Sequence, residues 1–297
     1  QPLRRAMYGF KAAVVGAGTM GAEIAHVIAS AGVPVLLKDL DQGLVDRGLE
    51  RAREVTAARG RSLVERGRLS EEQAGERLES AMALITGTTE YGGFGDVDFA
   101  IEAVPERMAL KQAVFGELDA VTPGHAILAS NTSALSIGEL GEVTSRPARV
   151  VGLHFFWPAS VMRLVEVVEG SRTSAETATA AMSFAQQIRK QPVRCADLPG
   201  FVVNRILTSA ISELWRVQEE EGLDVEEVDR AVRESRTAPM GPFFLADLLG
   251  LDTVVGVLEH LRASYGERFY VPPAMKALVE AGDLGQKTGR GFYEHSR

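Results

Sequence analysis

His154 and Glu166 are the two residues whose types and spacing could carry out proton transfer. His154 stands at the end of one apolar run, and Glu166 lies twelve residues later inside another, Leu164–Val168. A lone carboxylate within such a run is costly to bury unless it has a partner. If the two runs are neighbouring strands, the carboxylate holds the imidazole as a general base and stabilises the imidazolium. The pattern also fits a histidine bonded only to backbone and an exposed glutamate on an edge strand.

Three other polar groups could either bind a ligand or serve local structure. Residues 130–133 (Ser-Asn-Thr-Ser) follow a predicted strand, so we expect a loop at its carboxyl end that bonds a ligand or caps the next helix. Asn204 lies in the first turn of a predicted helix, where its amide could reach a ligand or satisfy local backbone. Glu106 and Lys111 flank the turn into another helix, and a solvated helix start is the rival explanation for both.

A glycine pattern near the N-terminus indicates where a dinucleotide would bind. An apolar strand runs into Gly16-x-Gly18-x-x-Gly21, and a helical pattern follows at once. In this motif the first glycine permits a tight turn, the second lets the pyrophosphate approach the backbone, and the third lets the helix pack closely on the strand. The amides at the helix start, which include those of Thr19 and Met20, then face the phosphates.

Asp39 is the acidic residue that this motif requires at the end of the second strand. It follows Gly21 by 18 residues, close to the spacing at which an acid accepts hydrogen bonds from the adenosine ribose. A carboxylate there repels the additional phosphate of NADP, so we expect NAD as the cofactor. Lys38 is adjacent, but strand alternation sends its side chain to the other face. The alternative interpretation is a glycine turn with a surface aspartate.

The predicted elements supply a fold that would bring these residues together. Strand and helix signals alternate over residues 1–197, which predicts an α/β domain with a doubly wound (Rossmann-type) parallel sheet. A charged helical insertion at 42–82 interrupts it, with a capping-box pattern at Ser70–Gln73. Residues 198–297 show almost no strand alternation, so we predict an all-helical C-terminal domain. Its expected helices are 201–221, 225–234, 243–265 and 273–281.

Composition limits the possible partners. The 297 residues carry a net charge of −8, which argues against a nucleic-acid surface. No apolar run is long enough to span a bilayer, and residues 1–6 lack the apolar core of a signal peptide. Cys195 is the only cysteine, so no internal disulfide can form and a reducing, cytoplasmic location is expected. No metal site is expected.

Together these residues belong to motifs that resemble one enzyme family over nearly the whole sequence. The motifs are Gly-Ala-Gly-Thr-Met-Gly, Ile-Glu-Ala-Val-Pro-Glu, Ser-Asn-Thr-Ser, Gly-Leu-His-Phe-Phe, Leu-Val-Glu-Val-Val, Pro-Gly-Phe-Val-Val-Asn-Arg, Pro-Met-Gly-Pro-Phe and Lys-Thr-Gly-Arg-Gly-Phe-Tyr. The chain resembles the L-3-hydroxyacyl-CoA dehydrogenases, including the dehydrogenase part of multifunctional fatty-acid oxidation enzymes. The resemblance implies reversible, NAD-dependent oxidation of an L-3-hydroxyacyl-CoA to a 3-oxoacyl-CoA.

The resemblance also implies roles for the catalytic residues. His154 removes the proton from the 3-hydroxyl group while hydride leaves C3 for the nicotinamide. Glu166 orients His154 and offsets its new charge. Ser133 and Asn204 hydrogen-bond the reacting oxygen and the thioester region, and so hold C3 in line with the ring.

For the ligands, the resemblance places NAD across the glycine turn, with Asp39 on the adenosine ribose. Glu106, Lys111 and Asn131 are assigned to the cofactor's ribose and nicotinamide side. The CoA phosphates need cationic contacts, which the charged insertion could supply, although a solvated helix face is the alternative. The candidates, among which the sequence does not choose, are Arg59, Arg61, Arg66 and Arg68.

Trp157 is the main departure from the family pattern. Members of the family usually carry Asn or Ser at this position, and the following Ala159–Ser160 replaces a usual Pro-Val. We expect the large side chain to reshape the pocket near the nicotinamide and to shift the preferred acyl group; a harsher interpretation is weak activity. Phe244 stands where Glu or Arg is common and is expected to alter packing alone.

Two alternative functions remain open, and the helical domain indicates how the chain could form an oligomer. A related dehydrogenase could act on a non-CoA hydroxy acid, for which it would need a cation near His154. A low-activity binding protein could retain the fold, and Trp157 is the one feature that favours it. The apolar faces of the helical domain are expected to pack on a second copy, giving a homodimer through the C-terminal domain.

Overall fold

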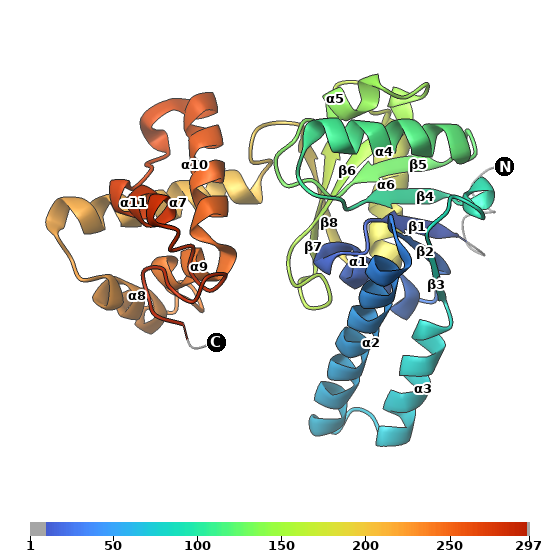
Figure 1. The fold of residues 1–297 in the computed structure, drawn as a ribbon, viewed down its shortest axis with the longest axis horizontal. Coiled ribbons are helices and arrows are strands. Elements are labelled where there is room, and N and C mark those ends of the chain that lie inside the picture. Colours follow the sequence, from blue (N-terminus) through green and yellow to red (C-terminus); the bar gives the residue numbers. More distant parts are fainter. Residues whose placement is uncertain (1–9, 296–297) are drawn as a thin grey trace. The chain divides into compact units, whose positions relative to one another are not determined.

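The computed structural model describes residues 10–295 and contains two compact units. Unit 1 extends to Leu198 and unit 2 begins at Pro199 (Figure 1), and each is described by itself. The stretch 1–6, which lacks a signal-peptide core in the sequence, lies outside the described residues. Within residues 10–295, none of the helices combines the length and the apolar character that crossing a bilayer requires.

Unit 1 is built on an eight-stranded sheet with the order β3-β2-β1-β4-β5-β6-β7-β8. Strands β1 to β6 run parallel, β7 runs antiparallel to β6, and β8 runs parallel to β7. The mostly parallel sheet confirms the predicted α/β class. The reversal at β7 follows from the short connection 156–163, because parallel neighbours need a long crossover. The strands are Ala12–Val15 (β1), Val35–Lys38 (β2), Ile85–Thr88 (β3), Phe99–Glu102 (β4), Ile127–Ser130 (β5), Val150–Phe155 (β6), Leu164–Glu169 (β7) and Gln191–Ala196 (β8).

Helices cover both faces of this sheet (Figure 1). On one face, α1 and α6 bury apolar side chains in a common core that includes Ile24 of α1 and Phe184 of α6. The Phe184 ring stacks on Phe99 of β4 with their centroids 4.3 Å apart. Helix α4 packs on β4 and β5, and α5 packs on β6. The helices are Thr19–Ser30 (α1), Gln42–Glu65 (α2), Glu71–Met82 (α3), Met108–Val121 (α4), Ile137–Glu142 (α5) and Ala175–Gln187 (α6).

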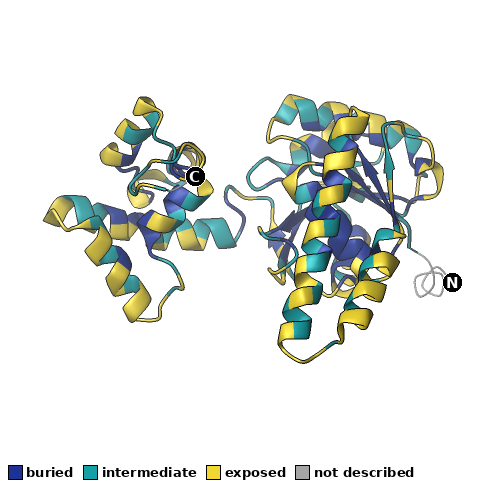
Figure 2. Cartoon of the chain, turned by 60° about the horizontal axis from the view of Figure 1, so that its bottom comes forward, coloured by how far each residue is buried: buried dark blue, intermediate teal, exposed yellow. Residues whose placement is uncertain are grey.

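The charged insertion forms a helical hairpin of α2 and α3 that extends away from the sheet (Figure 1). The Ser70 hydroxyl accepts the Gln73 N–H at 3.1 Å, and the Gln73 side chain accepts the Ser70 N–H at 3.0 Å. This reciprocal pair confirms the predicted capping box and satisfies two amides at the start of α3. The sheet is buried whereas the far end of the hairpin is exposed (Figure 2), as expected for its charged sequence.

Unit 2 is helical, as predicted, but the expected helix 243–265 is wrong in one respect. Gly250, with a φ of +94°, ends α9 and starts α10, so two helices stand in place of one. A single glycine within a helical pattern is often tolerated, which is why the sequence did not reveal this break. The helices are Val203–Glu221 (α7), Val225–Glu234 (α8), Pro242–Leu249 (α9), Leu251–Tyr265 (α10) and Pro273–Ala281 (α11).

Unit 2 has its own apolar core and a C-terminal tail that is held by a buried carboxylate. Trp215 of α7 packs with residues of α9 and α10 in this core. Asp247 of α9 accepts the N–H groups of Phe292 and Tyr293 at 3.0 and 2.9 Å and bonds His295 Nε2 at 2.8 Å. The glycine-rich tail therefore belongs to the structure of unit 2.

Candidate active site

The structure places His154 directly against Glu166. The antiparallel register pairs the two residues across β6 and β7, and His154 Nδ1 lies 2.8 Å from Glu166 Oε2, with side chains that are 6% and 1% exposed. A carboxylate can only accept, so Nδ1 donates and the lone pair of the neutral ring lies on Nε2. Because β7 lies between β6 and β8, Glu166 is not on an edge strand. A histidine held in this way can act as an oriented general base.

The glycine turn after β1 has the geometry that the fingerprint requires. Gly16 has a φ of +105°, and a Cβ there would lie 2.6 Å from the carbonyl oxygen of Ala103, the residue after β4. At Gly21 a Cβ would lie 1.7 Å from the Gly16 carbonyl oxygen, which explains the close helix packing. A Cβ at Gly18 would meet nothing within 4 Å. The open side of the turn is therefore at Gly18.

The start of α1 offers backbone amides at this open side. Gly18 is the N-cap residue of α1, and no side chain caps the helix there. The first-turn amides, including those of Thr19 and Met20, are therefore not satisfied by an N-cap side chain. An uncapped helix start with its positive dipole end is suited to phosphate oxygens.

Asp39 lies at the same turn. Its Oδ2 accepts the Ala17 N–H at 2.6 Å, and its Oδ1 accepts the Leu40 N–H at 2.7 Å. These bonds place the half-buried carboxylate beside the glycine turn rather than out on the surface. The ammonium group of Lys38 lies over the ring of Tyr91, 4.3 Å from its centroid, so the cation next to Asp39 in sequence has another partner.

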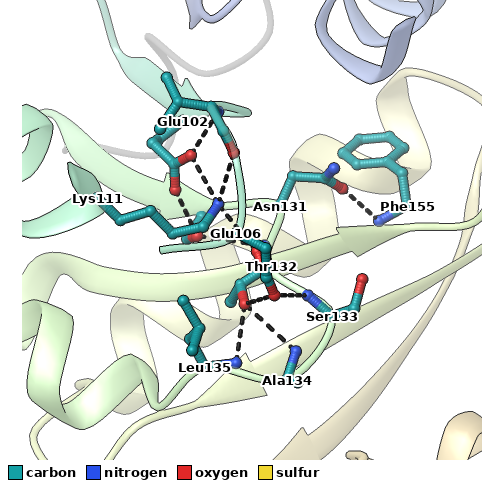
Figure 3. A network of polar contacts seen from close by, with 11 residues as sticks. Glu102, Glu106, Lys111, Asn131, Thr132, Ser133, Ala134, Leu135 and Phe155 are labelled. Atoms are coloured by element: carbon teal, nitrogen blue, oxygen red, sulfur yellow. Dashed lines mark hydrogen bonds and ion pairs between the residues drawn. The ribbon is translucent and has the colours of Figure 1, made fainter. Parts of the chain in front are cut away.

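Glu106 and Lys111 belong to a polar network whose centre is Glu102, at the end of β4 (Figure 3). The fully buried Glu102 accepts hydrogen bonds from Lys111 Nζ at 2.8 Å, Ser130 Oγ at 2.7 Å and the Val104 N–H at 2.6 Å. Lys111 also lies 3.2 Å from Glu106. The Lys111 side chain is 1% exposed and that of Glu106 43%. Lys111 therefore holds Glu106 from beneath, and Glu106 is the member that reaches the surface.

The loop after β5 is fixed by the same network (Figure 3). Thr132 Oγ1 and the Ser133 N–H both donate to Glu106 Oε1, at 2.5 and 2.9 Å. Asn131 Oδ1 accepts the Phe155 N–H at 2.9 Å, which ties this loop to the end of β6. The structure thus brings Glu106, Asn131 and Ser133 together at the carboxyl end of the parallel strands, where β6 carries His154.

The other predicted residues lie on separate elements. Asn204 is in the first turn of α7, as predicted, and belongs to unit 2. Arg59 lies on α2 and donates to the Ser160 carbonyl oxygen at 2.7 Å. The remaining candidates for CoA binding are exposed on the hairpin; they are Arg61, Arg66 and Arg68.

Sequence reasoning missed three buried charges near this edge: Glu102, Glu23 and Lys190. Glu23 accepts the Ser160 N–H at 3.2 Å, and Lys190 donates to the carbonyl oxygens of Ala159 and Met162. Burial, together with the nearby guanidinium of Arg59, lowers the pKa of Lys190 to about 8. A signal was available for the two glutamates, because Glu23 and Glu102 each interrupt an apolar run just as Glu166 does. Lys190, between Arg189 and Gln191, carries no such signal.

Comparison with known families decides the identity of the chain. The model of the 3-hydroxyacyl-CoA dehydrogenase NAD-binding domain matches residues 11–198, and that of the 3-hydroxyacyl-CoA dehydrogenase C-terminal domain matches residues 200–295. The chain belongs to the 3-hydroxyacyl-CoA dehydrogenase family. This confirms the resemblance seen in the motifs and makes the chain an NAD-dependent oxidoreductase.

The dehydrogenase matches both single enzymes and part of a longer one. It is 38% identical over 288 residues to the 3-hydroxybutyryl-CoA dehydrogenase of Clostridioides difficile, covering 97% of this chain and 100% of the relative. It is 40% identical over 293 residues to the fatty acid oxidation complex subunit alpha of Pseudomonas savastanoi pv. phaseolicola, covering 96% of this chain and 38% of the relative. The crystal structure of (S)-3-hydroxybutyryl-CoA dehydrogenase from Ralstonia eutropha has a TM-score of 0.88 and 38% identity, with 97% and 99% coverage.

The residues of the dehydrogenase fit its cofactor. The open side of the turn at Gly18 leaves room for a pyrophosphate, and the uncapped start of α1 provides amides. Asp39 lies beside this turn, where its carboxylate could accept a hydrogen bond from a ribose hydroxyl group. Among the described residues, no group of three His, Cys, Asp or Glu side chains could hold a metal ion.

Proposed function

We propose that the dehydrogenase oxidises the 3-hydroxyl group of L-3-hydroxyacyl-CoA thioesters, with His154 as its general base. The buried His154–Glu166 pair carries this proposal, since it lies at the edge where the parallel strands end. NAD⁺, when bound, takes the hydride from C3 of the substrate. His154 Nε2 takes the proton of the hydroxyl group, and Glu166 stabilises the imidazolium that forms. The products are a 3-oxoacyl-CoA and NADH, and the proton leaves through His154.

Ser133 and Asn204 are the residues proposed to position the substrate. Each offers a polar side chain that can hydrogen-bond the reacting oxygen or the thioester carbonyl, and such orientation contributes much of the rate. The support for Ser133 is its place beside Glu106 and Asn131, at the strand edge of His154. The support for Asn204 is its place in the first turn of α7 together with the family motif.

The cofactor is proposed to lie across the glycine turn, with Asp39 on the adenosine ribose. Glu106 and Asn131 are proposed to face its nicotinamide side, and the buried Lys111 is proposed to hold Glu106 there. The turn residues that would contact the pyrophosphate are Gly16, Gly18, Thr19, Met20 and Gly21.

The charged hairpin is the proposed place for the phosphates of CoA. Arg61, Arg66 and Arg68 are exposed there, whereas Arg59 already donates to the Ser160 carbonyl oxygen. Exposed guanidinium groups can form bidentate bonds with phosphates without first breaking an internal bond. We therefore favour Arg61, Arg66 and Arg68 over Arg59, which is also exposed but would have to give up its bond to Ser160.

A homodimer through unit 2 and a cytoplasmic location complete the proposal. Helix α7 carries exposed apolar side chains, including Ile206 at 61% and Leu207 at 47%, which a second copy could cover. Cys195 is the chain's single cysteine and is buried, so no internal disulfide can form, which suits a reducing compartment.

One assay tests the reaction. With NAD⁺ and L-3-hydroxybutyryl-CoA, we expect NADH to appear at 340 nm and the His154→Ala variant to lose at least about 10²-fold in kcat, as for removal of a general base. The Ala variant of the exposed His125, which is 61% exposed in its side chain, is the matched control and should keep wild-type kcat. A variant that retains wild-type turnover without the imidazole at 154 would disprove the role of His154.

The same assay separates the rivals. Free L-3-hydroxybutyrate replaces the thioester in a parallel reaction. Faster oxidation of the free acid would favour the dehydrogenase of non-CoA hydroxy acids. Tight binding of NAD⁺ without turnover of either substrate would favour a binding protein that retains the fold.

A further inference from the structure

The connection 156–163 between β6 and β7 exposes three large apolar side chains. Trp157 is 48% exposed, Val161 68% and Met162 40%. They lie on the connection that follows the strand of His154, and the ring of Phe156 lies against the His154 ring with centroids 4.5 Å apart. A group of exposed apolar side chains of this size beside a functional residue indicates a binding surface.

Three charged side chains from separate segments hold this connection in place, and two of them are buried. Lys190, just before β8, donates to the carbonyl oxygens of Ala159 and Met162. Glu23 of α1 accepts the Ser160 N–H at 3.2 Å and its hydroxyl at 3.4 Å. Arg59 of α2 donates to the Ser160 carbonyl oxygen at 2.7 Å. Glu23 and Lys190 are 2% and 8% exposed.

The backbone of the connection is also closed by its own hydrogen bonds. The N–H groups of Val161 and Met162 both donate to the Pro158 carbonyl oxygen, at 3.0 and 2.9 Å. Lys190 bonds both ends of this turn and Glu23 bonds its middle. These bonds fix the backbone of the connection, so its apolar side chains stay exposed. A surface that is both apolar and fixed binds an apolar ligand at a low cost in entropy.

We propose that Trp157, Val161 and Met162 form an apolar platform that binds the acyl chain beyond its fourth carbon and makes the enzyme prefer medium-chain acyl groups. The proposal rests on the proposed function. Of the two parts of an acyl-CoA, the CoA part is polar and carries phosphates, so the acyl tail is the part that matches an apolar surface. Trp157 is thus a specificity-determining residue, and Lys190 and Glu23 are positioning residues that hold the platform.

Binding of non-reacting acyl-CoA tests the platform without turnover. The chain has two tryptophans, and Trp215 is 3% exposed, so a solvent-sensitive change in emission reports Trp157. We expect octanoyl-CoA to shift the emission to shorter wavelength, butyryl-CoA and free CoA to leave it nearly unchanged, and Trp157→Phe to remove the shift. An equal shift with free CoA, or no shift at saturating octanoyl-CoA, would overturn the proposal.

Chain-length kinetics give the second test. Each buried methylene group is worth roughly fourfold in affinity, so loss of contact with about two of them predicts that Trp157→Asn lowers kcat/KM for 3-hydroxyoctanoyl-CoA at least about tenfold. For 3-hydroxybutyryl-CoA we expect a change of less than about twofold. Val143→Asn, which replaces a 44% exposed apolar side chain outside the connection, is the control and should change neither value. A uniform loss for both substrates would contradict the proposal.

The positioning role of Lys190 has its own readout. Lys190→Met removes the two hydrogen bonds that fix the platform, so we expect the ratio of kcat/KM for the C8 and C4 substrates to fall at least about threefold while the C4 value is kept. An unchanged ratio contradicts this role. If no hydroxyacyl-CoA is oxidised at all, the proposed function fails, and the fluorescence result alone then decides whether the platform binds acyl chains.

Discussion

At the scale of single residues, Glu166 decides how His154 can act. A carboxylate on Nδ1 fixes the tautomer whose lone pair is on Nε2, and it stabilises the charge that forms on the ring. Glu166→Gln keeps the size of the side chain but removes the charge. We expect kcat to fall about 10²-fold or more, with the KM for NAD⁺ unchanged, since Glu166 lies away from the glycine turn. Steady-state kinetics with saturating L-3-hydroxybutyryl-CoA and varied NAD⁺ measures both values.

The same strand supplies the control for this substitution. Glu169 also lies on β7, but it pairs at 2.8 Å with the partly exposed Arg194, and its side chain is 29% exposed. The guanidinium of Arg194 holds the pKa of Glu169 below its usual range. Glu169→Gln should leave kcat at the wild-type level. Equal losses of kcat in the two variants would mean that kcat depends on the negative charge of β7 and not on the contact of Glu166 with the imidazole.

His26 predicts a measurable loss of stability in acid. It bonds Thr56 Oγ1 at 2.6 Å, and burial, reinforced by the cations Arg59 and Lys190, lowers its pKa from 6.5 to about 4. Between these values the unfolded chain binds a proton that the folded protein does not, so lowering the pH favours unfolding. From pH 7 to pH 5 the free energy of unfolding should fall by up to about 2 kcal/mol from this group.

Urea unfolding at the two pH values measures this loss. In His26→Asn an amide replaces Nδ1 as donor, so the acid-dependent part should vanish in this variant. His125→Asn changes an exposed imidazole that lies 3.3 Å from Asp98, and it should retain the wild-type pH dependence. A His26→Asn variant that loses as much stability in acid as the wild type would rule out His26 as the cause.

The residues of the site were predictable to different degrees from the sequence. The pair of His154 and Glu166 could be proposed because a carboxylate within an apolar strand needs a partner. Glu102 carries the same signal, but its partners Lys111 and Ser130 lie 9 and 28 residues away. Which distant groups meet depends on strand register and helix packing, and these are not local properties of the sequence.

At the scale of elements, two glycines in the turn from β1 into α1 are expected to have different roles, one in cofactor binding and the other in stability. A Cβ at Gly18 meets nothing within 4 Å, whereas one at Gly21 would lie 1.7 Å from the Gly16 carbonyl oxygen. We therefore expect Gly18→Ala to keep the melting temperature and to raise the KM for NAD⁺ at least about tenfold, because its methyl group occupies the space of the pyrophosphate.

Gly21→Ala is the matched comparison on the same helix. Its methyl group collides with backbone, so α1 must move off β1, and we expect a loss of about 2 kcal/mol or more in the free energy of unfolding. Thermal melts without NAD⁺ and titration with NAD⁺ distinguish the two variants. If both lost stability equally and bound NAD⁺ equally, the division of roles between the two glycines would be wrong.

Elements were predictable where their signals are local. The alternating strands, the glycine turn and the capping box at Ser70 each depend on residues close in sequence, and all three are present. The break at Gly250 was missed because a helix can tolerate a glycine, and tertiary packing decides whether it does. The antiparallel direction of β7 depends on the short connection 156–163, which the sequence shows only as a gap between two strands.

At the scale of the whole molecule, the family motifs extend through both units, and the family models match residues 11–198 and 200–295. Motifs define the reaction because they mark the residues that contact cofactor and substrate. They do not define assembly, which depends on the apolar surface that folding leaves exposed. In unit 2, α7 has such a surface, because Trp215 and Ser212 are buried on one side and another side remains apolar and exposed.

The exposed side of α7 predicts how the homodimer that we propose can be broken. Leu207, Leu214 and Val217 are 47%, 38% and 39% exposed and recur at helical spacing, so they form one stripe. Placing two carboxylates in a packed apolar contact costs several kcal/mol unless they are paired. For Leu214→Glu/Val217→Glu we therefore expect a monomer at micromolar concentration, with an unchanged far-UV circular dichroism spectrum. Sedimentation velocity should show twice the chain's mass for the wild type and for the control Val143→Glu, and a double variant that stays dimeric would place the interface elsewhere.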